Sequence, residues 1–234
     1  GTTLLQRLLC SAPNTLIYGD TVGQEVEFFT NYASMREQML KSQQAAIEPV
    51  RSSVLSGNVS NFITTLSPSL KGSLKGFQAA CLASLEVCRT EALDAGREVW
   101  GWKIAGAEPN SLARLSQWYP EAKFIWVERN VEDCLSSAKA AGMLQGEAEA
   151  RNFVEKAKAC NQAFKQLTAN KLILDYQSIT EDQEKTIVHL ESFTGAKGID
   201  PTVFSERINQ FGNASYITPS PLTLEEAACT LSYH

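Results

Sequence analysis

The sequence predicts an α/β protein in which a parallel sheet is flanked by helices. In the second half of the chain, short apolar runs alternate with helical patterns, which is typical of βαβ units. The length of 234 residues suits one α/β domain with room for a helical insertion. We therefore predict a single domain over residues 1–234.

The first predicted unit is a helix followed by a strand. Residues 1–9 read as the mouth of a loop that runs into a helix with leucines on its buried side, and residues 15–18 form a short extended run. Residues 22–93 are then mostly helical in pattern, with breaks near 56–58 and 67–69. We predict that this stretch is a helical insertion after the first βα unit and forms the acceptor side of a site.

After the insertion, strands alternate with helices, and Gly195 suits the C-cap of the last helix. Ligands of parallel sheets bind at the carboxyl ends of the strands, so residues at those ends are the candidates for function. In chain order, we predict a strand over 98–104, a helix over 110–119, a buried strand over 123–128, helices over 130–141 and 148–170, a strand over 171–176 and a helix over 181–194.

Composition excludes several function classes. The formal net charge of -5 disfavours general binding of nucleic acids or anionic membranes, so an anionic ligand would need a local site. No apolar run reaches the roughly 18 residues that a membrane span needs. The six cysteines lack CxxC spacing, which indicates reduced thiols of a cytoplasmic protein and no metal. Because the chain begins at Gly1 without Met, we expect a targeting segment or further loop residues before it.

The Gly1-Thr2-Thr3 loop before the first helix is a candidate phosphate site. Free backbone N–H groups and the positive end of the helix dipole hold phosphate, and threonine hydroxyls can add hydrogen bonds. The alternative is a simple N-cap. A nucleotide kinase would carry Gly-Lys-Ser/Thr here, and this loop lacks the lysine.

Arg129 follows the predicted strand over 123–128. An arginine at the end of a buried strand is costly unless it is paired. It could pair with Asp133 or bind a phosphate in bidentate fashion, and both readings stay open from the sequence. Ser137 lies on the next predicted helix, where its hydroxyl could reach the same anion.

These motifs, in this order, resemble those of sulfotransferases that use 3′-phosphoadenosine 5′-phosphosulfate. Gly1-Thr2-Thr3 resembles the end of the P-loop-like segment that surrounds the 5′-phosphosulfate. Arg129 and Ser137 match the residues that grip the 3′-phosphate. Trp100-Gly101-Trp102-Lys103 resembles a strand end whose lysine faces the sulfuryl group, and Tyr176 matches a tyrosine near the adenine.

The resemblance covers roughly residues 1–46 and 98–196 and is closer to the bacterial and tyrosyl-protein types than to the cytosolic steroid and phenol type. It implies in-line transfer of a sulfuryl group to an acceptor hydroxyl or amine without a metal. The acceptor could be a small molecule, a carbohydrate or a peptide. The catalytic residues would be Asp20 and Lys103; the donor-binding residues would be Gly1, Thr2, Thr3, Arg129, Ser137 and Tyr176.

Asp20 is the best candidate for a base, because it stands where the tyrosyl-protein type carries its catalytic Glu. Its alternative role is to cap the following helix. Glu25 and Glu27 are fallbacks. Some sulfotransferases place a histidine two residues after the lysine, where this chain has Ala105, and the two histidines of the chain, His189 and His234, are remote from the motifs.

The chain also departs from the family pattern. Val131 replaces the usual Pro, and Gln177 and Ser178 stand where Glu and Asp are usual. Arg207 and residues 212–215 would have to replace an Arg-Lys-Gly loop near the C-terminus. These departures leave two alternatives, a nucleotide-binding or interaction module without catalysis and a P-loop kinase.

Overall fold

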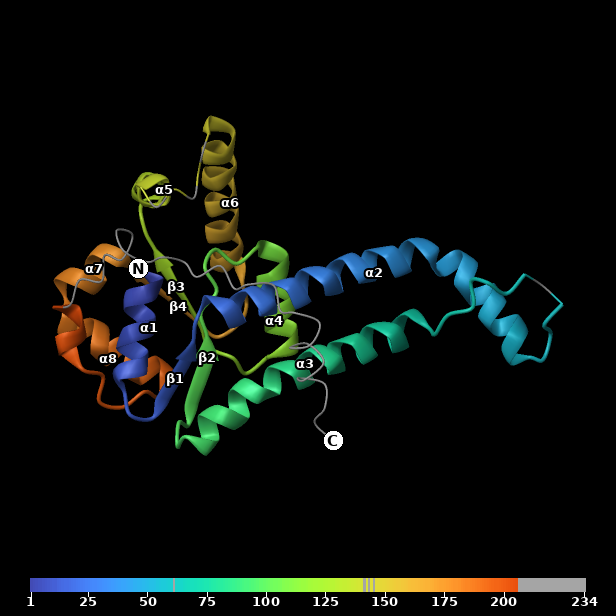
Figure 1. The fold of residues 1–234 in the computed structure, drawn as a ribbon, viewed down its shortest axis with the longest axis horizontal. Helices are drawn as coiled ribbons and strands as arrows, with labels where there is room; N and C mark the ends of the chain where they lie inside the picture. The colour runs from blue at the N-terminus through green and yellow to red at the C-terminus, as the bar shows by residue number, and fades with distance from the viewer. Residues whose placement is uncertain (61, 141, 143, 145, 206–234) are drawn as a thin grey trace, which may run out of the picture.

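The computed structural model describes residues 1–60, 62–140, 142, 144 and 146–205. It is a mixed α/β protein whose strands pair in parallel, as predicted (Figure 1). Strand β1 (Thr15–Tyr18) pairs with β2 (Val99–Trp102), and β3 (Phe124–Glu128) pairs with β4 (Lys171–Asp175). Within the described residues these are two separate pairs, where the sequence predicted one sheet. The P-loop-like geometry therefore stays a prediction.

Helix α1 (Thr2–Ser11) covers the core that joins the two strand pairs. Its leucines Leu5, Leu8 and Leu9 are buried, as the spacing predicted, and they pack with Leu174 of β4. The same core includes residues of α7 (Tyr176–Glu181), α8 (Gln183–Thr194) and the 3₁₀-helix η1 (Pro201–Phe204). Helix α1 thus packs in one core with residues of the strands and of the C-terminal helices.

Helix α7 was not predicted as a separate element. The Asp175 side chain accepts a hydrogen bond from the backbone N–H of Ser178 at 2.9 Å and so caps α7, and Asp182 caps α8 in the same way. The sequence predicted a strand that ends at residue 176 and one helix over residues 181–194. The two caps instead begin two helices, α7 and α8. Gly195 has φ 88° at the C-cap of α8, which confirms the predicted glycine cap.

The predicted helical insertion consists of α2 (Asp20–Leu55) and α3 (Leu70–Asp94), which leave the body together as a long arm (Figure 1). At its base the arm packs on α4 (Pro109–Trp118) through a cluster that contains Val26, Leu85 and Leu115. A second cluster brings Cys81 and Trp118 together. The base of the arm is therefore part of the body's core.

The remaining helices are α5 (Val131–Ala140) and α6 (Glu147–Gln166). Phe164 of α6 is fully buried and stacks on Trp126 of β3, with ring centroids 5.2 Å apart. The residues of β3 are all half-buried, so the expectation of a buried strand was wrong. Within the described residues β3 pairs with β4 alone, and Ile125 and Val127 pack against the core around α1.

Candidate active site

The carboxyl end of β2 meets the first turns of α1 and α2 at Lys103. Its Nζ lies 2.8 Å from Oδ2 of Asp20 and donates a hydrogen bond to Oγ1 of Thr3 at 3.3 Å. The Lys103 side chain is only 12% exposed, whereas that of Asp20 is 48% exposed. The structure therefore brings together a shielded cation, an accessible carboxylate and the predicted phosphate loop.

This meeting depends on Gly23, which the sequence analysis did not single out. A Cβ atom at Gly23 would lie 2.0 Å from the backbone oxygen of Lys103, a distance that real Cβ atoms do not show. Helix α2 therefore begins in direct backbone contact with the end of β2, and Asp20 lies one turn earlier, beside Lys103. In the sequence, the signal for this close contact was a glycine, Gly23, three residues after the candidate base Asp20.

The carboxylate of Asp20 pairs with Lys103 and does not cap helix α2. The N-cap of α2 is Gly19, and no side chain caps this end of the helix. Asp20 is the first helical residue, where the positive end of the helix dipole favours a carboxylate. The capping alternative for Asp20 was therefore wrong.

The two fallback bases are engaged elsewhere. Glu25 accepts a hydrogen bond from Ser84 at 3.3 Å, and Glu27 accepts one from the backbone N–H of Glu108 at 3.2 Å. The base nearest to Lys103 in the described contacts is thus Asp20.

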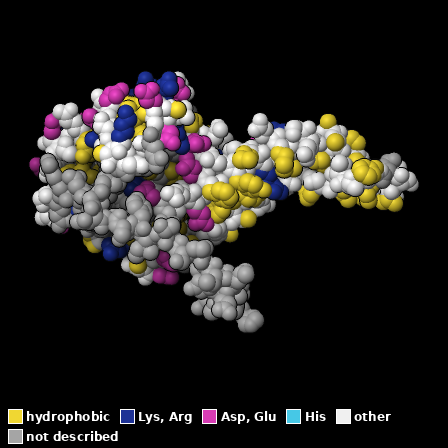
Figure 2. Space-filling view, turned by 45° about the horizontal axis from the view of Figure 1, so that its top comes forward, with side chains coloured by type: hydrophobic (Ala, Val, Ile, Leu, Met, Phe, Trp, Pro, Cys, Tyr) yellow, Lys and Arg dark blue, Asp and Glu magenta, His cyan; other side chains and the backbone are white. Residues whose placement is uncertain are grey.

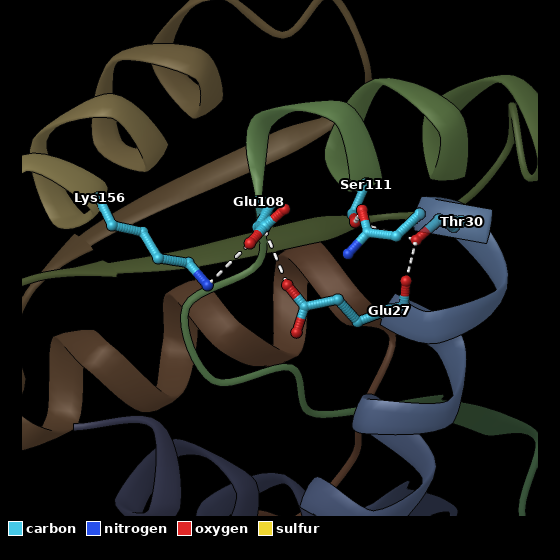
Figure 3. A network of polar contacts seen from close by, with 6 residues as sticks. Glu27, Thr30, Glu108, Ser111 and Lys156 are labelled. Atoms are coloured by element: carbon cyan, nitrogen blue, oxygen red, sulfur yellow. Dashed lines mark hydrogen bonds and ion pairs between the residues drawn. The ribbon is translucent and has the colours of Figure 1, made fainter. Parts of the chain in front are cut away.

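Glu27 belongs to a polar network that joins α2 to α4 and α6 (Figure 3). Lys156 pairs with Glu108 at 3.0 Å, and the buried hydroxyls of Thr30 and Ser111 lie 2.9 Å apart. Burial acts to lower the pKa of Lys156, but the hydrogen bond to Glu108 and the carboxylates of Glu108 and Glu27 outweigh it and raise that pKa. This network keeps Lys156 charged and fixes the base of the arm.

Gly1 brings the N-terminus of α1 against β3 and α7. A Cβ on Gly1 would lie 2.7 Å from Cγ1 of Val127 and 2.8 Å from Cδ2 of Tyr176. The guanidinium of Arg129 stacks over the Tyr176 ring, with Cζ 4.8 Å from the centroid. Three predicted donor-binding residues thus gather beside the first turn of α1.

Arg129 has unused hydrogen-bonding capacity. Its Nε is buried without a hydrogen-bond partner, and among the described residues it makes no ion pair with Asp133. A buried donor without a partner is costly, and among the described residues no group pairs with this one. The pairing with Asp133 is thus absent among the described residues, and the role of Arg129 as an anion ligand stays a prediction.

The electrostatics favour an anion at the start of α1. Two cations lie near this point: the Nζ of Lys103 donates a hydrogen bond to Thr3, and the guanidinium of Arg129 stacks on the Tyr176 ring that lies against Gly1. The first N–H groups of a helix, here those of Thr2 and Thr3, lack partners within the helix. Positive charge and free N–H groups therefore act at the same point.

Ser137 lies exposed on α5, in a helix whose start is organised by Asn130. The Asn130 side chain accepts a hydrogen bond from the backbone N–H of Glu132 at 2.8 Å, and Val131 takes the first helical position, where the family has Pro. The described contacts do not join Ser137 to Arg129, so its role stays a prediction. Arg207, residues 212–215 and His234 lie outside the described residues.

Other predicted features can be followed in the described part of the chain. Cys10, Cys81, Cys88, Cys134 and Cys160 are free thiols there. No cluster of three His, Cys, Asp or Glu side chains forms among the described residues. Of the helices described, none combines the length and apolar character required to cross a membrane.

The fold and the site define a mixed α/β protein with a cationic, glycine-lined site at the carboxyl ends of its parallel strands. The sequence profile of the sulfotransferase family matches residues 1–200. The chain therefore belongs to the sulfotransferase family and is a transferase enzyme, which confirms the predicted family and enzyme class. No curated protein sequence matches it.

Proposed function

We propose that this protein transfers a sulfuryl group from 3′-phosphoadenosine 5′-phosphosulfate to an acceptor hydroxyl or amine. The observation that carries the proposal is the convergence of Thr3, Asp20 and Lys103 from three elements, beside the Arg129–Tyr176 stack. A cation, a carboxylate and a helix N-terminus are the groups that displacement at an anionic donor requires.

The residues present fit a bisphosphate nucleotide. The free N–H groups after Gly1 and the Thr2 and Thr3 side chains suit the 5′-phosphate end of the donor. The unpaired Nε of Arg129 suits the 3′-phosphate, with Ser137 as a further donor from α5. The Tyr176 ring, which already stacks on Arg129, suits the adenine side of the ligand.

The bound donor supplies an activated sulfuryl group. Lys103 stabilises the charge that builds up on the phosphate oxygen as the bond from sulfur to that oxygen breaks. Asp20 takes the proton of the acceptor as the bond from the acceptor atom to sulfur forms. The Asp20 carboxylate and the Lys103 ammonium lie 2.8 Å apart beside the first turn of α1, so both side chains can reach a donor bound there.

The acceptor approaches from the side of Asp20, whose carboxylate is half-exposed while Lys103 is shielded. This side faces the start of α2, in line with the expectation that the helical insertion forms the acceptor side. A small molecule, a carbohydrate and a peptide all fit an approach from solvent, so the proposal covers each class of acceptor.

Calorimetry and thermal unfolding of the full chain with 3′-phosphoadenosine 5′-phosphate test this proposal, with AMP and with ATP plus Mg²⁺ as controls. Ligand that binds only the native state raises the melting temperature. We expect selective stabilisation by the bisphosphate. Preference for ATP with Mg²⁺ would favour a kinase, and tight binding without turnover of any acceptor would favour a binding module.

A further inference from the structure

The far end of the α2–α3 arm is apolar and uncharged. Residues 52–70 contain no Asp, Glu, Lys, Arg or His. Isolated exposed hydrophobic residues are common, but a group of them at one point marks an interaction surface. Figure 2 shows hydrophobic side chains at this end of the arm. The exposed ones, which we call the tip residues, are Leu55 (73% exposed), Val59 (62%), Phe62 (80%), Ile63 (39%) and Leu66 (46%).

Cations flank this tip on both sides. Arg51 precedes it and pairs with Glu48 at 2.8 Å, whereas Lys71 and Lys75 follow it, exposed and without an ion pair among the described residues. Residues 35–75 contain five Lys or Arg and two Glu, a net charge of +3. Since the whole chain carries -5, the other residues carry -8. The outer part of the arm, residues 35–75, is therefore positive, whereas the whole of residues 20–94 carries six Lys or Arg and eight Asp or Glu, a net charge of -2.

The length of the arm separates these charges. At about 1.5 Å per residue, α2 alone extends for roughly 54 Å. Charges in solution are screened over about 8 Å at physiological ionic strength. An anionic surface in contact with the tip would therefore meet the arm's cations and not the body's acids (Figure 1). The net charge of the whole chain, which disfavours membrane binding, does not describe the tip.

We propose that the tip residues bind the surface of an anionic lipid bilayer. Apolar side chains such as Phe62 and Leu55 enter the boundary between headgroups and acyl chains, and Lys71 and Lys75 lie at the level of the headgroup phosphates. A second copy of the chain is a poorer partner, because tip-to-tip packing would bring the cations of two arms together. Anionic headgroups neutralise those same cations. The proposal is independent of the transfer reaction.

Vesicle sedimentation with the full chain tests the proposal. We expect binding to phosphatidylcholine vesicles that contain phosphatidylserine, much weaker binding to phosphatidylcholine alone, and weakening by salt. The double variant V59D/F62D should lower the vesicle partition coefficient tenfold or more. The double variant K71E/K75E should remove the preference for phosphatidylserine. These side chains are exposed, so the melting temperature should stay unchanged.

Val188 provides the matched control. It lies on α8 of the body and is 56% exposed, so V188D adds one aspartate at a comparably exposed site away from the arm, as V59D alone does on the tip. Equal loss of binding in V188D, or no binding by the unaltered chain, would overturn the proposal. A concentration-dependent dimer in light scattering that V59D/F62D abolishes would assign the tip to a second copy instead.

Discussion

The site at the strand ends and the tip of the arm present their polar and charged side chains in opposite ways. At the site, Lys103 is shielded and held by an acid and a hydroxyl, and glycine allows backbone to meet backbone. On the arm, Lys71 and Lys75 are exposed, and Gly76 has open space where a side chain would be. Close packing orients a few polar groups in the body, whereas the arm presents side chains outward along two helices.

Residue type alone therefore does not reveal the role of a side chain. Gly23 and Gly76 both lie inside helices, yet a Cβ at Gly23 would collide with backbone and one at Gly76 would meet nothing. Likewise, Lys103 and Lys75 carry the same charge but differ in burial and in partners. Substitutions at matched positions of the body and the arm test this difference.

The largest effect is expected for Asp20→Asn. A general base contributes about 100-fold to 10,000-fold in rate, so turnover should fall within that range while the affinity for 3′-phosphoadenosine 5′-phosphate is retained. Steady-state kinetics and calorimetry measure the two quantities separately. Equal losses of turnover and donor affinity would show that Asp20 positions Lys103 and does not take the proton.

Gly23→Ala should lower the free energy of unfolding by about 3 kcal/mol, because helix and strand would have to move apart to make room for the new Cβ. Gly76→Ala is the matched control on the arm. It should raise stability by about 0.5–1 kcal/mol through helix propensity. Urea unfolding measures both, and equal effects of the two variants would remove the distinction between body and arm.

Arg129→Ala should weaken binding of 3′-phosphoadenosine 5′-phosphate by about 1.5–3 kcal/mol, the range for a charged hydrogen bond. Arg89→Ala is the control, because Arg89 pairs with Glu86 on α3 with both side chains half-exposed. Calorimetry of the two variants gives the comparison. Unchanged affinity in Arg129→Ala would remove Arg129 from the donor site.

The smallest effect concerns Glu37, which joins the arm to the body. Hydrogen bonds from Lys41 and Arg114 lower the pKa of Glu37 below its usual value. Because the pKa of Glu37 is lower in the folded than in the unfolded protein, the Glu37 carboxylate stabilises the fold at pH values above the ordinary carboxyl pKa near 4.5. This contribution is lost as the pH falls through the pKa of Glu37 in the folded protein. Glu37→Gln should therefore cost about 1 kcal/mol at pH 7.

That cost should shrink as the pH falls through the lowered pKa of Glu37, because the carboxyl group of the unaltered protein then becomes protonated. Unfolding curves over a descending series of pH values test this, with Glu86→Gln as a control for an exposed pair within one helix. A difference between Glu37→Gln and the unaltered protein that persists at low pH would point to packing and not to charge.

Much of the fold followed from local patterns in the sequence. The leucines of α1, the two long helices before β2 and the glycine cap after α8 were predicted because periodicity and capping act over a few residues. The separate helix α7 was missed, because Asp175 and Asp182 each cap a helix, and spacing alone did not identify both caps. Cap identity depends on where the chain turns in space.

The candidate site divides in the same way. The order of the motifs is visible in the sequence alone, and it was enough to predict the family and the candidates Asp20, Lys103 and Arg129. The tertiary structure adds that Asp20 pairs with Lys103, that Gly23 permits this approach and that the Nε of Arg129 has no hydrogen-bond partner among the described residues. These are contacts between residues far apart in the chain, and their distances depend on how whole helices and strands pack.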